Sequence, residues 1–174
     1  MKVIILILSI TILSDQITKY LVHSRMLLGQ SFEFIPFILN ITYVTNTGAA
    51  FGILQNHRWV FMSSTTLAII GMIFALRYLH KRKQFPFMRI AIAFMLGGGI
   101  GNMFDRVTKG YVIDFMDLAF VNFAIFNLAD MYIIFGAISF CVYIITNARE
   151  IDAVFEKRPK LCEERADNRD DEIS

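Results

Sequence analysis

The 174-residue chain has few of the residues that cross-link small proteins or bind metals. Its two cysteines, Cys141 in an apolar segment and Cys162 in a polar one, provide no disulfide framework. The three histidines are scattered, and no two share a ligand spacing such as HExxH. No serine or cysteine has a base placed to activate it. The sequence therefore predicts no metal site, no cofactor and no such nucleophile.

Charged residues are also scarce, at 18%, whereas 56% of the residues are hydrophobic and 14% are aromatic. A soluble domain of this length could not bury so much apolar surface. Residues 1–148 carry 11 Lys and Arg against 6 Asp and Glu, while residues 149–174 carry 6 against 9. We therefore expect a membrane domain over 1–148 and a separate polar, solvated tail over 149–174.

Four apolar segments are long enough to cross a bilayer: about 3–22, 59–79, 90–107 and 123–146. No small-x-small cleavage site follows the first segment, which favours an uncleaved anchor over a secretory signal. The short loop 80–84 is basic, with Arg77 and Arg89 beside it, and this predicts a cytoplasmic location for the loop. With four spans, both termini and the tail are then cytoplasmic, and segments 23–58 and 108–122 face outside.

The two outer segments are not ordinary loops. Residues 31–34 alternate polar with apolar side chains, and residues 40–45 are β-branched and partly alternating, which predicts short strands on the membrane surface. Residues 114–120 are too apolar for a free loop, and we expect them at the membrane interface. The predicted fold is an all-α integral membrane protein with four transmembrane helices and a small extracytoplasmic β element.

Four carboxylates lie in or against the apolar segments, where an ionised group is costly unless it has a partner or a function. Asp105 follows Arg89 by 16 residues and Asp130 precedes Thr146 by 16, so both lie roughly 24 Å from the cytoplasmic face. Asp15 lies at roughly 20 Å on the same count, and Gly110 lets the chain turn back so that Asp114 returns to this layer. The sequence thus predicts an acidic layer near the outer face.

Paired carboxylates are the chemistry that this layer suggests. Two neighbouring carboxylates cannot both ionise cheaply, so one keeps a proton and the other can activate water, as in aspartic proteases. A proton-coupled carrier and a non-catalytic scaffold are the alternatives, but carriers place such acids near the midplane of internal repeats. The glycine-rich stretch 97–101 predicts close helix packing rather than a phosphate loop, and Asn102 after it departs from the Gly-x-Gly-Asp of presenilin-like proteases.

Five sequence blocks, in order, resemble the lipoprotein signal peptidases, the signal peptidase II family of bacterial aspartic membrane proteases. They are 15–19 (DQITK), 46–52 (NTGAAFG), 97–106 (GGGIGNMFDR), 112–115 (VIDF) and 126–130 (FNLAD). The resemblance implies a catalytic dyad of Asp114 and Asp130. Depth alone ranks Asp105 and Asp114 equally, and the resemblance favours Asp114. It also implies a set of substrate-binding or supporting residues: Asn46, Gly48, Asn102, Asp105, Arg106, Asn127, Ala129, Asp15 and Lys19.

The resemblance further implies what the protein acts on. The family's substrate is a prolipoprotein whose lipobox cysteine carries a diacylglyceryl group, and cleavage occurs just before that cysteine. The expected partners are these substrates and membrane lipids, without nucleic acid, for a monomeric enzyme that needs no metal and is inhibited by the cyclic peptide globomycin. The expected location is the bacterial cytoplasmic (inner) membrane, with the active site near the outer face.

Overall fold

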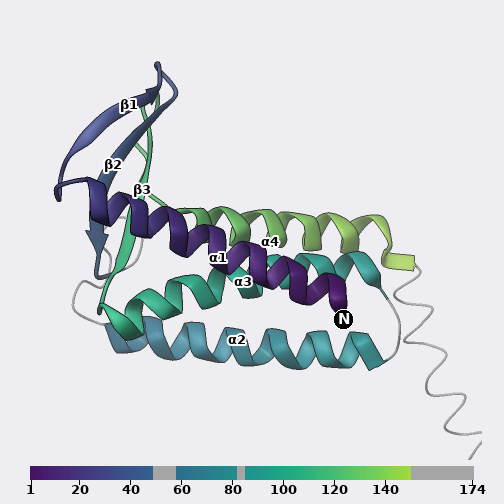
Figure 1. Cartoon of the computed structure of the whole chain (residues 1–174). Coiled ribbons are helices and arrows are strands. Elements are labelled where there is room, and N and C mark those ends of the chain that lie inside the picture. The colour runs from purple at the N-terminus through teal and green to yellow at the C-terminus, as the bar shows by residue number, and fades with distance from the viewer. Residues whose placement is uncertain (49–57, 82–84, 150–174) are drawn as a thin grey trace, which may run out of the picture.

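The computed structural model describes residues 1–48, 58–81 and 85–149, which form four long helices and a small sheet (Figure 1). Most of the predicted tail, residues 150–174, lies outside the described residues. The helices are α1 (Lys2–Arg25), α2 (Arg58–Lys81), α3 (Pro86–Thr108) and α4 (Leu128–Thr146). Each is long and apolar enough to cross a membrane, because a bilayer core of about 30 Å needs about 20 helical residues. The four predicted apolar helices are confirmed.

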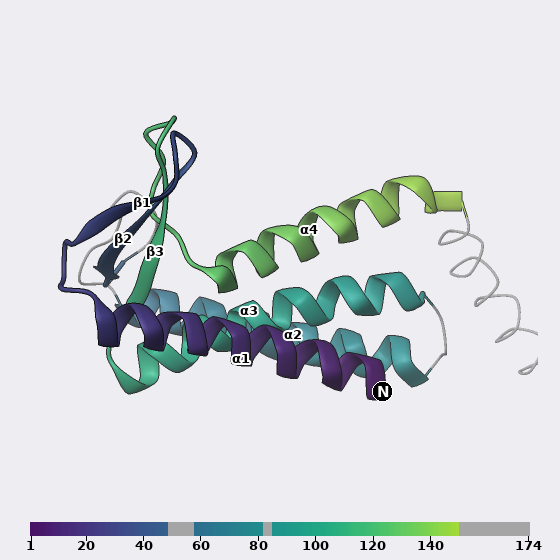
Figure 2. The same cartoon turned by 45° about the horizontal axis from the view of Figure 1, so that its top comes forward.

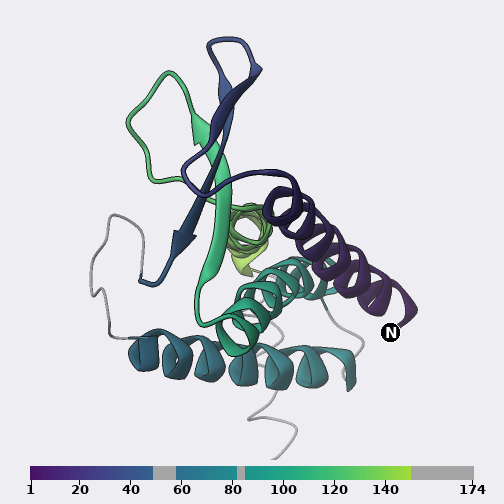
Figure 3. The ribbon, with the colours of Figure 1, turned by 60° about the vertical axis from the view of Figure 1, so that its left-hand side comes forward.

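Helix α3 is the centre of the bundle, and it contacts each of the other three helices. Figure 3 shows it between α2 on one side and α1 and α4 on the other. Its most apolar stretch is 56% buried, against 6% to 17% for the other helices, which leaves their large side chains facing outward. Such an exposed apolar surface on a helix bundle is suited to contact with lipid rather than water.

The glycines of α3 permit this central position. A Cβ on Gly98 would collide with the carbonyl oxygen of Ala129 in α4, and one on Gly101 would lie 2.6 Å from Asp15 Oδ2 in α1. Both neighbouring helices therefore approach the backbone of α3 more closely than any larger residue would allow. The expected packing role of this glycine-rich stretch is confirmed.

The sheet stands at the end of the bundle away from the N-terminus (Figures 1 and 2). It is antiparallel, with the order β1 (Ser31–Ile35), β2 (Leu39–Asn46) and β3 (Val112–Leu118). The first two strands were predicted and are confirmed. The third strand is formed by a segment that was expected only to lie at the membrane interface. It pairs with β2 from Leu39↔Leu118 to Asn46↔Val112, with an irregularity between Ile41 and Val44.

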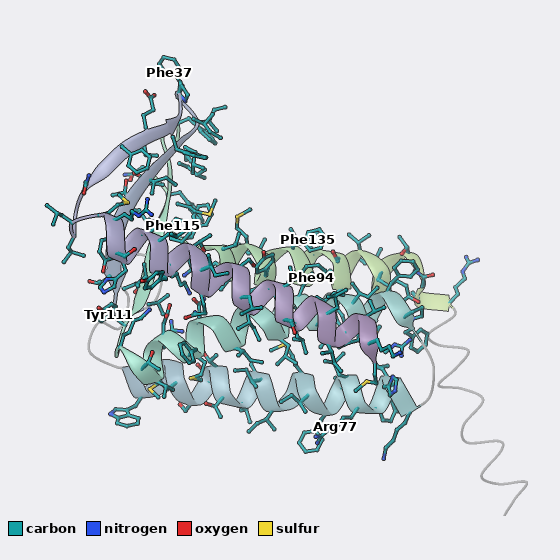
Figure 4. The ribbon with its side chains drawn as sticks, viewed as in Figure 1. Phe37, Arg77, Phe94, Tyr111, Phe115 and Phe135 are labelled. Carbon is teal, nitrogen blue, oxygen red and sulfur yellow. The ribbon has the colours of Figure 1, made fainter. Side chains whose placement is uncertain are left out.

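A small core joins the sheet to the bundle. Val22 of α1 packs with Tyr43, Ile113 and Phe115, all of them buried, and Tyr111 lies against the cluster. Figure 4 shows Tyr111 and Phe115 where the sheet meets the helices. This contact fixes β3 relative to α1, and with it the acidic side chain that lies between Ile113 and Phe115.

Helix α4 begins at Leu128, five residues later than the predicted span that started at residue 123. The reason is local: the side chain and backbone of Asn127 and Asp130 form a reciprocal capping box, which satisfies free N–H groups at the helix start. Residues 123–127 instead approach β3, where Phe126 bridges to Met116. The sequence signal was an asparagine followed three residues later by an acid.

Candidate active site

Asp130 is held at the first turn of α4 by the capping box. Its Oδ2 accepts from the backbone N–H of Asn127 at 3.2 Å, and its own N–H donates to Asn127 Oδ1 at 3.1 Å. The other carboxylate oxygen, Oδ1, accepts from Asn102 Nδ2 at 2.8 Å. Asp130 is half-buried, so it is oriented by three polar contacts and still open to a ligand on one side.

Asp114 projects from β3 into the junction between the sheet and the helices, and it is only 2% exposed. Its Oδ2 accepts from Asn46 Nδ2 on β2 at 2.9 Å, and its Oδ1 accepts from Asn127 Nδ2 at 2.6 Å. The backbone N–H of Gly48 donates to Asn46 Oδ1 at 3.0 Å. Because Asn46 Oδ1 accepts this N–H, the amide nitrogen of Asn46 is the group that faces Asp114.

The environment of Asp114 favours its protonated form. Burial raises its pKa to about 6, and the negative charge of Asp130 adds to the rise. The hydrogen bonds from Asn46 and Asn127 act in the opposite direction, because they stabilise the carboxylate. Burial is the largest of these effects, so the Asp114 carboxyl, with its pKa of about 6, can hold a proton close to neutral pH.

Two asparagines connect the two carboxyl groups. Asn127 Nδ2 donates both to Asp114 Oδ1 and, at 3.1 Å, to Asn102 Oδ1. Asn102 Nδ2 in turn donates to Asp130. Both asparagines are buried, and the result is a continuous chain of hydrogen bonds that runs from Asp114 through Asn127 and Asn102 to Asp130.

A buried lysine supports this chain from α1. Lys19 is fully buried, and its Nζ donates to Asn102 Oδ1 at 2.8 Å. The same ammonium forms ion pairs with Asp15 Oδ2 and Asp105 Oδ2, both at 2.9 Å. Because Lys19 and Asn127 both donate to Asn102 Oδ1, the amide nitrogen of Asn102 must face Asp130.

Asp105 and Asp114 have different interaction partners in the structure. Asp105 pairs with Lys19 through one oxygen and with Lys109 through the other, at 2.9 Å in each case. Lys109 was not singled out in the sequence, although its position four residues after Asp105, at the C-cap of α3, was a usable signal. A carboxylate between two ammonium groups is an ion-pair partner, whereas Asp114 is bound by neutral amides.

The remaining expected residues surround this centre. Asp15 Oδ1 accepts the backbone N–H of Ala129 at 3.0 Å and thereby joins α1 to the start of α4. Arg106 interacts electrostatically with Asp130, Asp114 and Asp105, in that order of strength, without a direct ion pair. Among residues 1–48, 58–81 and 85–149, no three His, Cys, Asp or Glu side chains are grouped as metal ligands.

The chain is similar to known proteins over most of its length. The family described as signal peptidase (SPase) II matches residues 7–146. The chain belongs to the signal peptidase II family. It is 44% identical over 131 residues to the lipoprotein signal peptidase of Brevibacillus brevis, covering 75% of this chain and 87% of that protein. The lipoprotein signal peptidase of Clostridioides difficile is 36% identical over 141 residues, covering 81% and 93%.

Two solved structures are similar to this chain over most of its length. A bacterial membrane enzyme determined at 2.3 Å resolution superposes with a TM-score of 0.74 at 36% identity, covering 85% of this chain and 90% of that one. A second bacterial membrane enzyme gives a TM-score of 0.70 at 38% identity. The family match over residues 7–146 includes the sheet and nearly all of the four helices, and the protein is a multi-pass membrane protein.

Proposed function

We propose that the protein is an aspartic endopeptidase that removes the signal peptide from diacylglyceryl-modified prolipoproteins by cutting before the lipidated cysteine. The observation that carries the catalytic assignment is the chain of hydrogen bonds that joins Asp114 to Asp130 through two asparagines. The substrate class rests on family membership and on the names of the relatives.

The two carboxyl groups have different roles in this mechanism. Asp114, with its pKa of about 6, carries the shared proton and donates a hydrogen bond to the scissile carbonyl oxygen. Asp130 is the less buried of the two carboxyl groups, and it removes a proton from the attacking water. The proton then passes to the leaving amine, and the dyad returns to its singly protonated state.

The supporting residues hold this geometry. Asn46 and Asn127 orient Asp114, and Asn102 orients Asp130. Lys19 fixes Asn102, while Asp15 and Asp105 neutralise the buried ammonium. Arg106 adds positive charge beside the dyad, and Gly48 and Ala129 contribute through their backbone N–H groups.

In the membrane, the sheet and the dyad lie near the outer face of the bacterial cytoplasmic membrane, and both termini are cytoplasmic. The basic residues at the other end of the bundle, including Arg77 and Arg89, support this orientation. The position suits the substrate, because its lipid lies in the outer leaflet while its signal helix crosses the bilayer. The enzyme acts as a monomer and requires no metal ion.

The test is to incubate the purified protein with a lipidated prolipoprotein and with the same precursor lacking the lipid. Cleavage of the lipidated precursor alone is expected. Asp114→Asn and Asp130→Asn should each reduce turnover by about a hundredfold to ten-thousandfold, whereas Asp105→Asn should retain cleavage per folded molecule. A dead Asp105→Asn with an active Asp114→Asn would show that the dyad is wrong, and equal cleavage of both precursors would show that the substrate class is wrong.

A further inference from the structure

A concave site lies at the end of the bundle opposite the sheet. It is a cavity of about 380 Å³ between the first turns of α1, the last turns of α2 and the first turns of α3. Its wall is aliphatic, with Ile5 and Leu8 from α1, Ile73 from α2 and Leu96 from α3. None of these residues belongs to the proposed peptidase site.

The mouth of this cavity is basic. Four of its lining residues carry nitrogen groups that bind anions: Arg77, His80, Lys81 and Arg89. No acidic residue lines it, and among the described residues no carboxylate forms an ion pair with Arg77, Lys81 or Arg89. Figure 4 shows Arg77 on the part of α2 that lies away from the sheet. The positive charge here is therefore uncompensated by the part of the chain that the structure describes.

Arg89 has a buried hydrogen-bond donor for which the described residues supply no acceptor. Its Nη1 donates to His80 Nδ1 at 3.2 Å, which fixes the guanidinium plane and makes this nitrogen of the histidine the acceptor. Its Nε is buried and has no hydrogen-bond partner among the described residues. A buried donor without an acceptor is unfavourable, and a guanidinium group with free N–H groups matches the oxygens of a phosphate.

We propose that this cavity binds one anionic phospholipid, with the phosphate at Arg89 and Arg77 and the adjoining hydrocarbon against the aliphatic wall. A free phosphate would complement the charge but not the apolar wall, whereas a phospholipid complements both. The four helices are long and apolar enough to lie in a membrane, so the mouth of the cavity is at the depth where headgroups meet helix ends. The lipid would hold the ends of three helices together at the pole opposite the catalytic carboxylates.

The test is native mass spectrometry of the full-length protein in a nonionic detergent, titrated with phosphatidylglycerol and, separately, with phosphatidylcholine of the same acyl chains. We expect the single-lipid adduct to form preferentially with phosphatidylglycerol. Arg89→Gln should weaken that adduct about fivefold to tenfold, because it removes one charged phosphate contact. Ile73→Trp, which fills the aliphatic part and leaves every charge in place, should weaken it as well.

Arg25→Gln is the matched control, since Arg25 is also a basic residue in a terminal helical turn but lies at the other end of α1. It should leave the affinity for phosphatidylglycerol within about twofold. The proposal is overturned if Arg89→Gln binds phosphatidylglycerol as the wild type does, or if Arg25→Gln weakens binding equally, which would indicate non-specific attraction. It is also overturned if inorganic phosphate displaces the lipid and Ile73→Trp has no effect, because the site would then bind the phosphate alone.

Discussion

Removal of the Asn46 amide is expected to shift the pH dependence of cleavage, and not only its rate. Asn46 Nδ2 donates to Asp114 Oδ2 at 2.9 Å and stabilises the ionised form of that carboxyl. In Asn46→Ala this donor is lost while Asp114 keeps its burial and its hydrogen bond from Asn127. The ionised form then becomes less favourable, so the pKa of Asp114 must rise above its value of about 6.

The size of the shift follows from the energy of that contact. A hydrogen bond to a charged acceptor contributes about 1.5–3 kcal/mol, and one pKa unit corresponds to about 1.4 kcal/mol. The pKa of Asp114 should therefore rise by about 1 to 2 units. If Asp114 acts as the protonated partner, activity falls as pH rises through its pKa, and in the variant this alkaline limb should move upward by the same amount.

The assay is kcat/KM for a lipidated precursor from about pH 5 to about pH 9, because this ratio reports the ionisations of the free enzyme. Asn40→Ala is the matched control: Asn40 is also an asparagine of β2, but it pairs with Asp117 instead of contacting Asp114. It should leave the midpoint unchanged. Asn46→Ala also removes the contact with Gly48, which would lower the rate at every pH without moving the midpoint.

An alkaline limb that stays in place or moves downward in Asn46→Ala would contradict the role of Asp114 as the protonated partner. The first result would mean that the limb reports another group. The second would mean that Asp114 must be ionised for catalysis, and the roles proposed for Asp114 and Asp130 would then be exchanged.

Three further predictions concern stability, each measured as thermal or denaturant unfolding in detergent. Lys19→Met should destabilise the protein by about 3–5 kcal/mol, because Asp15 and Asp105 both lose the buried ammonium with which they form ion pairs. A loss of stability under about 1 kcal/mol would contradict the buried ion-pair role of Lys19. Gly98→Ala should lower the stability by about 1–3 kcal/mol, because its Cβ would collide with the Ala129 carbonyl. Gly99→Ala should be tolerated, because its Cβ would lie 3.6 Å from Ile69. Equal losses of stability in the two variants would contradict the packing role of Gly98. The pKa of Asp114 is 3.8 in the unfolded chain and about 6 in the folded protein. Between these two pH values the folded state binds more protons at Asp114 than the unfolded state does. The stability that Asp114 contributes at acid pH is therefore lost as pH rises. Asp114→Asn should therefore be more stable than the wild type by up to about 3 kcal/mol above pH 6, and an advantage at acid pH instead would contradict that sign.

Much of the fold could be predicted from the sequence because its signals are local. The length of an apolar run determines whether a helix can span a bilayer, and all four helices follow from it. The alternation in residues 31–34 and 40–45 was enough to predict β1 and β2. The start of α4 was misplaced only because the Asn127–Asp130 capping box was not taken into account.

The sequence also determined which residues to examine, since the five ordered blocks contain every member of the hydrogen-bonded chain from Asp114 to Asp130. Depth in the membrane alone could not separate Asp105 from Asp114. Counting residues along a helix gives depth in the membrane, but it does not give the partner that a side chain meets at that depth. Asp105 meets two lysines, whereas Asp114 meets two amides.

The tertiary structure decided these partners because they come from segments far apart in the chain. Asp114 reaches the site through the pairing of β3 with β2, and the register of that pairing places Asn46 beside it. Lys19 meets Asn102 only because glycines let α1 approach α3 closely. Composition and local pattern thus determined a membrane-spanning bundle with buried acids, while long-range packing determined which acid is neutralised by lysine and which can hold a proton.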